Sequence, residues 1–408
     1  MNNVAFTICS RSYIGMANVL RHSFLKNHNN YDFFIVLADT DSEEVENCIY
    51  AEKILNDKIS VEKYEEMAFK YDVTEFCTSL KPFILNYFLE QKYELAVYID
   101  PDICFYSHFS ELDDKSKSIY ITPHIITMRS NYDGDEKEEN FLKYGIYNCG
   151  FIAFRRTHIS FSVLQWWSEK LFDYSFADAE WGVYTDQKWI DFLPNFIPTN
   201  ELSIIHNYGC NIAPWNFYER EIFMKNDSYY VKERNGNSDE NELVFIHFSG
   251  YNYLKLINGI IEHNHRKMKN YEDLNYFILK YGEDLKFNKA SEGFSKGYKY
   301  NKFSNGDVIF KFHRRLYRQL LIQNYHYDNL FSSKGQMYEI LMNNKMIVHN
   351  GGDVKSKSSV SNIDSKRRLL NYFYKLTFRL LGVRRFVEFL TALQMYSRFE
   401  TQVELLKM

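Results

Sequence analysis

Two aspartates, Asp100 and Asp102, directly follow an apolar run at 95–99 and precede a second apolar run at 103–105. Bounded apolar runs of this length predict buried strands. Buried charges must be paired or bind a metal ion, so two carboxylates at the end of a buried strand are hard to explain by structure alone. Because Pro101 fixes the turn between them, both side chains can face one divalent cation that keeps open positions for phosphate oxygens. The sequence therefore predicts a metal site at the end of this strand.

A histidine in another apolar run adds a third candidate ligand. His247 lies in the predicted strand at 243–248, and a neutral imidazole is a good ligand beside two carboxylates. The alternatives are a core histidine bonded to the backbone and a turn in which the aspartates cap backbone amides. The two features together favour metal binding. Gly250, which follows closely, would let the backbone approach a pyrophosphate.

Strand and helix patterns alternate over residues 1–120. Such βαβ alternation predicts an α/β fold with a mostly parallel, doubly wound sheet, in which ligands bind at the carboxyl ends of the strands. Asp39 and the aspartate pair all follow predicted strand ends, which agrees with this arrangement. The predicted strands lie at 4–9, 32–38, 59–63, 95–99 and 119–122, and the predicted helices at 16–27, 44–55 and 75–90.

Composition narrows the class of protein. The net charge of −4 over 408 residues argues against a general nucleic-acid binder. The six cysteines are scattered, without a Cys-x-x-Cys pair, which indicates reduced cysteines of a cytoplasmic protein rather than a disulfide framework. The first residues read as a strand rather than a signal peptide, and no window of 18 uninterrupted apolar residues predicts a membrane span.

Further candidates lie before and after the aspartate pair. Lys81 is on the helix that precedes the metal strand and could neutralise a donor phosphate, the alternative being a solvated surface lysine. Asn148 and Gly150 lie in a predicted strand at 147–154. Glycine in a strand often marks the close approach of a ligand or another backbone, and the alternative is a β-bulge.

An acid and an amide stand side by side at Asp186 and Gln187, among aromatic residues. Such a pair suits sugar hydroxyls, whose donors and acceptors both need partners. The other interpretation is a helix N-cap at Thr185 or Asp186, and both interpretations can hold together.

The C-terminal part has a different character. Helical periodicity dominates after about residue 255, and residues 366–386 carry seven Lys or Arg and no acid. This segment fits an interfacial helix on an anionic membrane surface, and the alternative is a set of helices that pack on the catalytic domain. We expect a domain at 1–255, a helical extension at 256–349, a flexible linker at 350–365 and basic amphipathic helices at 366–408.

The order and spacing of these motifs resemble the GT-A glycosyltransferases, especially the family 8 type. The matching features are Asp-x-Asp at 100–102, Asn-x-Gly at 148–150, Asp-Gln at 186–187 and His-x-x-Gly at 247–250. The match covers roughly residues 3–255. The chain is similar also to a group of bacterial glycosyltransferases in the sequence around these motifs.

The resemblance implies a GT-A fold, which is a Rossmann-like mixed sheet flanked by helices, with a nucleotide-sugar donor, usually UDP-linked, and Mn²⁺ or Mg²⁺. By resemblance, Asp100, Asp102 and His247 hold the metal. Asp186 and Gln187 line the donor sugar or the reaction centre and are the candidate catalytic residues. The candidate donor-binding residues are Thr7, Asp39, Lys81, Asn148, Gly150, Gly250 and Lys255.

One segment departs from the family pattern. Family 8 enzymes usually continue His-x-x-Gly into a Lys-Pro-Trp that clamps the diphosphate, whereas residues 250–255 here read Gly-Tyr-Asn-Tyr-Leu-Lys. Lys255 is therefore displaced and no Pro-Trp follows. We favour a retaining reaction. An inverting reaction would need a carboxylate base, for which Asp186 or Asp191 could serve.

The expected function is metal-dependent transfer of a sugar from a nucleotide sugar to a hydroxyl of a saccharide or glycolipid acceptor in bacterial surface polysaccharide assembly. The basic tail suggests a lipid-linked acceptor, with the protein cytoplasmic and peripheral on the inner face of the membrane. A sugar-nucleotide nucleotidyltransferase is one alternative, but residues 10–15 lack the glycine-rich loop of that class. The other alternative is a degenerate carbohydrate-binding scaffold, against which the intact Asp100, Asp102 and His247 set argues.

Overall fold

The computed structural model describes residues 3–39, 45–349 and 363–406. The chain forms two compact units. Unit 1 comprises Met1–Val61 and Val73–Lys299, and unit 2 comprises Glu62–Asp72 and Tyr300–Met408. The domain boundaries expected at residues 255, 349 and 365 stay predictions, and most of the expected linker, 350–362, lies outside the described residues.

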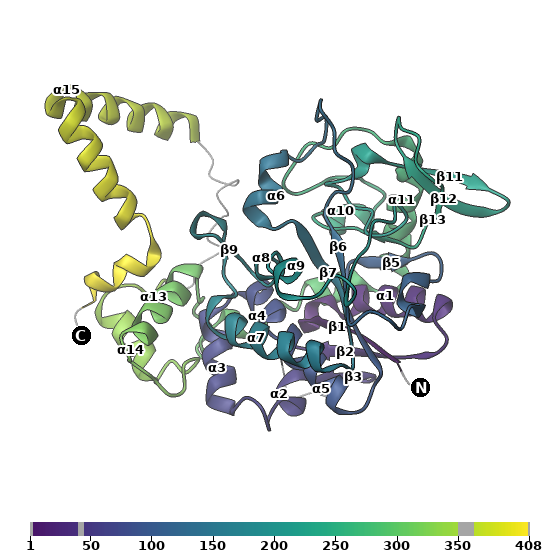
Figure 1. Cartoon of the computed structure of the whole chain (residues 1–408). Coiled ribbons are helices and arrows are strands. Elements are labelled where there is room, and N and C mark those ends of the chain that lie inside the picture. The colour runs from purple at the N-terminus through teal and green to yellow at the C-terminus, as the bar shows by residue number, and fades with distance from the viewer. Residues whose placement is uncertain (1–2, 40–44, 350–362, 407–408) are drawn as a thin grey trace. The chain divides into compact units, whose positions relative to one another are not determined.

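Unit 1 is built on a seven-stranded mixed sheet with the order β10-β6-β7-β4-β1-β2-β3 (Figure 1). Strand β1 is parallel to β2 and β4, whereas β7 is antiparallel to β4 and β6. The expected α/β class and mixed sheet are confirmed. The strands are β1 Asn3–Cys9, β2 Tyr31–Leu37, β3 Cys48–Tyr50, β4 Leu95–Ile99, β6 Ile119–Pro123, β7 Tyr147–Arg155 and β10 Leu202–Ile204.

Helices cover both faces of this sheet (Figure 1). Helix α1 matches the helix expected at 16–27, whereas the single helix expected at 75–90 is divided into α4 and α5. The helices of unit 1 are α1 Ile14–Asn27, α2 Ala51–Ile54, α4 Val73–Ser79, α5 Lys81–Glu90, α6 Glu138–Tyr144, α7 His158–Tyr174, α8 Gln187–Ile190, α9 Leu193–Phe196, α10 Tyr253–Leu256, α11 Glu272–Phe287 and α12 Ala290–Phe294.

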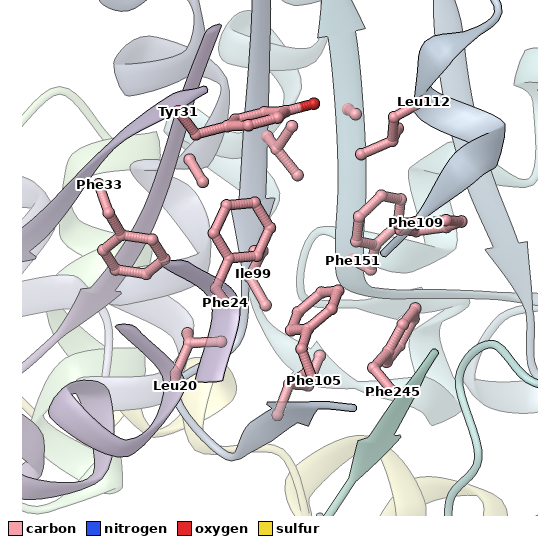
Figure 2. Close-up of a cluster of buried hydrophobic side chains, with 14 of the residues drawn as sticks. Leu20, Phe24, Tyr31, Phe33, Ile99, Phe105, Phe109, Leu112, Phe151 and Phe245 are labelled. Carbon is pink, nitrogen blue, oxygen red and sulfur yellow. The ribbon is translucent and has the colours of Figure 1, made fainter. Parts of the chain in front are cut away.

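Side chains of successive strand residues pack on opposite faces, as the period of two requires. Phe33 belongs to the cluster that α1 covers with Leu20 and Phe24 (Figure 2). The next residue, Phe34, stacks instead on Phe88 of α5, with ring centroids 5.3 Å apart. The sheet is therefore buried on both sides, and only its edges and strand ends are available for a site.

Shorter strands flank the main sheet. Strand β5, Ile103–Phe105, pairs with β14, Phe245–His247, in antiparallel register, with His247 opposite Ile103. This pairing brings a late part of the chain to the end of β4. The remaining strands are β8 Ala177–Asp178, β9 Val183–Tyr184, β11 Arg220–Lys225, β12 Ser228–Glu233 and β13 Asn241–Glu242.

Two of the expected elements are wrong. The helix expected at 44–55 contains strand β3 followed by the four-residue helix α2 over its described part. The strand expected at 59–63 lies where helix α3, Val61–Lys70, begins. The buried residues Tyr64, Met67 and Ala68 recur at helical spacing, so α3 buries one face as an amphipathic helix does.

Unit 2 is helical, which confirms the mainly helical C-terminal region. Its core includes Phe69, Leu316 and Met337. The buried guanidinium of Arg314 donates to backbone carbonyls at the end of α3 and satisfies carbonyls that lack intrahelical partners. The C-terminal helices are α13 Lys311–Ile322, α14 Gln336–Asn343 and α15 Ile363–Tyr396, the last interrupted at Gly382. None of the helices in the described ranges is both long and apolar enough to cross a membrane.

Candidate functional site

The structure brings the predicted metal ligands together at the end of β4. Asp100 and Asp102 lie in the turn between β4 and β5, and His247 ends β14 beside them. One ligand atom from each residue lies within 4.8 Å of the others. His247 Nε2 is 3.0 Å from Asp102 Oδ1 and 3.7 Å from Asp100 Oδ2. Residues far apart in the sequence thus converge on one point.

The imidazole of His247 is oriented by an amide. His247 Nδ1 lies 3.2 Å from Asn148 Oδ1, and an amide oxygen only accepts hydrogen bonds, so Nδ1 carries the proton. Nε2 is thereby directed at the carboxylates, as in protein metal sites where the second ring nitrogen fixes the ligand. Asn148, predicted to bind the donor, contacts His247 in this structure.

The pKa values show how strongly the histidine and the carboxylates interact. Burial lowers the pKa of His247, but the nearby carboxylates of Asp102 and Asp100 outweigh it and raise the pKa above the usual value. Burial acts to raise the pKa of Asp102, but His247 and the Tyr253 hydroxyl lower it overall. The site therefore favours an ionised acid with a cation beside it. Two carboxylates and an imidazole also form a chemically suitable set for a divalent cation.

Gly150 leaves the space that this arrangement needs. A Cβ atom on Gly150 would lie 2.5 Å from His247 Cε1 and 2.9 Å from Asp100 Oδ2. It would also lie 2.9 Å from Asn148 Oδ1. The Gly150 carbonyl accepts a hydrogen bond from the Asp100 backbone N–H at 2.7 Å. The close approach expected at this glycine is made by the side chains of the site itself.

Lys81 is an internal residue that joins two carboxylates, so the alternative of a solvated lysine is excluded. Its side chain is 1% exposed, and Nζ lies 2.6 Å from Asp186 Oδ2 and 3.6 Å from Asp100 Oδ1. It also donates to the Cys149 carbonyl at 2.8 Å. Burial acts to lower the pKa of Lys81, but the two carboxylates raise it overall, so the ammonium stays charged. The buried ammonium thus has one hydrogen bond and two carboxylates beside it.

Asp186 is buried and directly follows a residue with a strained backbone. Burial raises its pKa, against the opposing effect of Lys81. Thr185, which donates to Asp186 Oδ1 at 3.0 Å, has φ of +46°, a conformation that a β-branched residue rarely adopts. Strain of this kind persists where the surroundings impose it, often at functional sites. Asp186 makes no side-chain cap to α8. The half-buried Gln187 donates to the Tyr144 carbonyl at 3.0 Å.

Thr7 and Asp39 lie at the carboxyl ends of β1 and β2. Asp39 is buried, and its carboxylate accepts the backbone N–H of Arg11 at 2.8 Å and that of Lys299 at 3.3 Å. Burial raises its pKa, with the backbone donors acting in the opposite direction. The Thr7 hydroxyl is buried with no hydrogen-bond partner in the described part of the chain. Neither side chain forms a hydrogen bond with Asp100 or Asp102 in the described ranges.

Gly250 and Lys255, at the two ends of the segment 250–255, both have neighbours within the protein. Gly250 has φ of +78°, and a Cβ there would lie 2.5 Å from His263 Nε2, so both the turn and a protein neighbour require glycine. Lys255 is half exposed, and its Nζ lies 2.5 Å from Glu262 Oε2.

Two tyrosines of the site were not predicted from the sequence. Tyr253, from the same departing segment, places its hydroxyl 3.0 Å from Asp102 Oδ2. Tyr98 donates its hydroxyl to Asp100 Oδ1 at 2.5 Å. The strand period of two puts Tyr98 on the same side as Asp100, which is a usable signal. Nothing comparable in the sequence identifies Tyr253, because its contact depends on the path of the chain after β14.

Comparisons with known proteins give only distant likenesses. No protein-family model and no curated protein matches the chain. A galactosyltransferase, LgtC, solved with donor and acceptor sugar analogs, is 14% identical, with a TM-score of 0.38, covering 70% of this chain and 96% of that one. A glycosyltransferase involved in glycosylation of the major capsid of PBCV-1 is 12% identical, with a TM-score of 0.31, covering 52% of this chain and 85% of that one.

A third solved structure, mouse xyloside xylosyltransferase 1, is 11% identical, with a TM-score of 0.30, covering 52% of this chain and 88% of that one. These solved structures are glycosyltransferases, the class that the motifs predict.

Proposed function

We propose that the protein is a metal-dependent glycosyltransferase that moves a sugar from a nucleotide sugar, expected to be UDP-linked, to a hydroxyl of a saccharide or glycolipid acceptor. The observation that carries the proposal is the convergence of Asp100, Asp102 and His247 at the end of β4, with the Lys81–Asp186 pair directly attached. Ligands of open α/β sheets bind at this edge. A cluster of acids there suits a metal-bound diphosphate.

The three converging side chains would hold Mn²⁺ or Mg²⁺. Asp100 and Asp102 offer hard carboxylate oxygens, and His247 offers Nε2 because Asn148 engages Nδ1. When bound, the ion would neutralise negative charge that grows on the departing diphosphate. Gly150 keeps the space between these ligands free.

The residues around this point would orient the reacting groups. We propose Asp186 and Gln187 as the catalytic residues that face the donor sugar, with Lys81 holding Asp186 in place. In a retaining, front-face route the leaving phosphate can accept the proton of the acceptor hydroxyl, so no protein base is needed. Asp186 is paired with Lys81, and Asp191 accepts from Ile146 N and Lys188 Nζ, which supports the retaining route over one that needs either acid as a base.

The remaining candidates would bind the donor. The ends of β1 and β2 suit the nucleoside, and the turn after His247 suits the diphosphate. The proposed donor-binding residues are Thr7, Asp39, Asn148, Gly150, Gly250 and Lys255, with Lys81 acting through Asp186 and Asp100.

The C-terminal helix would bring the enzyme to its acceptor. We propose that α15 binds an anionic membrane surface, at the inner face of a bacterial membrane where lipid-linked acceptors for surface polysaccharide are presented. Large apolar side chains of α15 are exposed, including Leu370 at 67% and Tyr372 at 64%. The seven basic residues of 366–386, with no acid among them, complement anionic lipid.

A thermal-shift experiment tests the transferase proposal. A ligand that binds the native state raises its melting temperature by mass action, so UDP with Mn²⁺ should raise it and chelator should abolish the shift. Asp102→Ala should lose the shift, and Asp113→Ala, which removes an exposed acid, should keep it. No shift with any nucleotide would overturn the proposal in favour of a scaffold. Release of pyrophosphate from a nucleoside triphosphate and a sugar phosphate would favour the nucleotidyltransferase.

A vesicle experiment tests the membrane proposal separately. Full-length protein should co-sediment with vesicles that contain phosphatidylglycerol and much less with pure phosphatidylcholine vesicles. Arg384→Glu with Arg385→Glu should weaken binding, because each basic residue near an anionic surface contributes about 1 kcal/mol. Equal sedimentation of the wild type with both vesicles, or of the variant and the wild type with anionic vesicles, would contradict the proposal.

A further inference from the structure

We infer, on the basis of the proposed function, that Tyr253 and Tyr98 are positioning residues of the metal site. Each hydroxyl holds one oxygen of one aspartate so that the other oxygen of that aspartate faces His247. The observation behind the inference is a symmetry in the contacts of the two carboxylates.

Asp102 shows the first half of this symmetry. Its Oδ2 lies 3.0 Å from the Tyr253 hydroxyl, whereas its Oδ1 lies 3.0 Å from His247 Nε2. A carboxylate with one oxygen held in this way cannot rotate freely about its Cβ–Cγ bond. Asp102 therefore presents a single oxygen toward the point where the three ligands meet.

Asp100 shows the second half. Its Oδ1 accepts the Tyr98 hydroxyl at 2.5 Å, and its Oδ2 is the oxygen nearer His247 Nε2, at 3.7 Å. Tyr98 is 2% exposed, and Lys81 Nζ lies 4.1 Å from the centre of its ring. The ring is thus fixed by the core, and its hydroxyl has a fixed position relative to Asp100.

Tyr253 also ties together the two parts of the chain that supply the ligands. Its hydroxyl also lies 2.9 Å from the carbonyl of Phe248, the residue after His247, so its one proton is shared between this carbonyl and Asp102 Oδ2. The Phe248 N–H donates in turn to the Asp102 carbonyl at 2.8 Å. The ring itself stacks on Phe294, with centroids 6.1 Å apart. Tyr253 therefore links the turn that carries Asp102 to the strand that carries His247.

A neutral hydroxyl is well suited to this task. A hydroxyl orients a carboxylate without adding to the positive charge that Lys81 already places 3.6 Å from Asp100 Oδ1. Groups that hydrogen-bond to metal ligands typically change metal affinity by 10- to 100-fold when they are removed. Tyr253 and Tyr98 are placed to act in this way.

Tyr281 provides a matched control. It is 1% exposed and its ring stacks on Phe248 with centroids 4.0 Å apart, so it lies in the same region. Its hydroxyl is buried with no hydrogen-bond partner among the residues that the structure describes. Tyr281→Phe therefore removes the same atom as Tyr253→Phe without touching a carboxylate.

The test measures Mn²⁺ binding to the full chain by electron paramagnetic resonance of the free ion, without nucleotide. Tyr253→Phe and Tyr98→Phe should each weaken Mn²⁺ binding by about 10-fold or more, and Tyr281→Phe should bind like the wild type. Unchanged affinity in the first two variants would overturn the inference. If the wild type itself binds no Mn²⁺, the metal site of the proposed function fails instead.

A double-variant cycle separates positioning from loss of folding. In the Asp102→Asn background, Tyr253→Phe should cause little further loss of Mn²⁺ affinity, because its effect passes through that carboxylate. A further loss of the same size as in the wild-type background would mean that Tyr253 acts on general stability, and would contradict the inference.

Discussion

Acids at the ends of two parallel strands of the same sheet are used in different ways. Asp39, beyond β2, gives its carboxylate to the backbone N–H groups of Arg11 and Lys299. Asp100 and Asp102, beyond β4, are held by side chains and direct one oxygen each toward His247. All three residues are aspartates at the carboxyl ends of strands, but their hydrogen-bond partners differ.

The difference shows what makes a strand-end acid available to a cation. Backbone N–H groups from two other segments of the chain hold the Asp39 carboxylate. The tyrosine hydroxyls and Lys81 orient the acids beyond β4. One oxygen of each acid then faces His247 Nε2. All these acids lie at strand ends, so the groups that orient them account for the difference.

Removing Lys81 should have the largest effect on stability. Lys81→Met leaves Asp186 and Asp100 without their buried cation, and loss of one partner of a buried pair typically costs about 3–5 kcal/mol. The free energy of unfolding in denaturant measures this. Lys255→Met, which breaks a half-exposed pair with Glu262, should cost far less, because exposed ion pairs contribute little to stability.

A second substitution checks the cause of that loss. Lys81→Met combined with Asp186→Asn should recover part of the stability, because one of the uncompensated acids becomes neutral. A double variant no more stable than Lys81→Met alone would show that Lys81 contributes by packing rather than by charge.

Neutralising one acid of each region sharpens the comparison directly. Asp102→Asn removes a negative charge beside a divalent cation, a loss of several kcal/mol at an effective dielectric constant of about 20, so Mn²⁺ affinity should fall by at least roughly 100-fold. Asp39→Asn should leave it unchanged. Calorimetric titration measures the Mn²⁺ affinity of both variants. Equal losses of affinity would contradict the distinction between the acids beyond β4 and Asp39.

Filling the space at Gly150 should have an intermediate effect. Gly150→Ala places a methyl group against His247, Asn148 and Asp100, and overpacking of this kind typically costs about 1–3 kcal/mol. Mn²⁺ affinity should fall together with stability. Gly259→Ala, at a glycine with positive φ and open surroundings, should affect stability alone. Normal Mn²⁺ binding by Gly150→Ala would contradict the geometry of the site.

The smallest expected effect is a pH dependence at Asp39. Burial raises its pKa in the folded state, so the folded protein binds this proton more readily than the unfolded chain. Relative to Asp39→Asn, the wild type should gain stability as pH falls through the folded pKa, until about pH 4, the ordinary value for aspartate. Melting temperatures of both proteins across this range measure the difference, and an opposite slope would contradict the assignment.

Much of the site could be predicted from the sequence because its signals are local. The two aspartates adjoin a bounded apolar run, and His247 lies in another, so strand ends and their chemistry are visible without the fold. The helix expected at 44–55 and the strand expected at 59–63 were wrong because short apolar runs do not distinguish strand from helix.

Other features of the site depend on contacts that no local pattern contains. Lys81 meets Asp186 only because α5 and the start of α8 come together in the fold. Tyr253 reaches Asp102 only through the path of the chain after β14. These side chains orient the acids beyond β4, whereas backbone N–H groups hold Asp39.

The most direct test of the central claim is a crystal structure of the full chain grown with Mn²⁺ and UDP, with the ion located by anomalous scattering. The account predicts one Mn²⁺ bonded to Asp100, Asp102 and His247 Nε2, with the diphosphate on its open side. An ion bound elsewhere, or these three residues without an ion at saturating Mn²⁺, would contradict it.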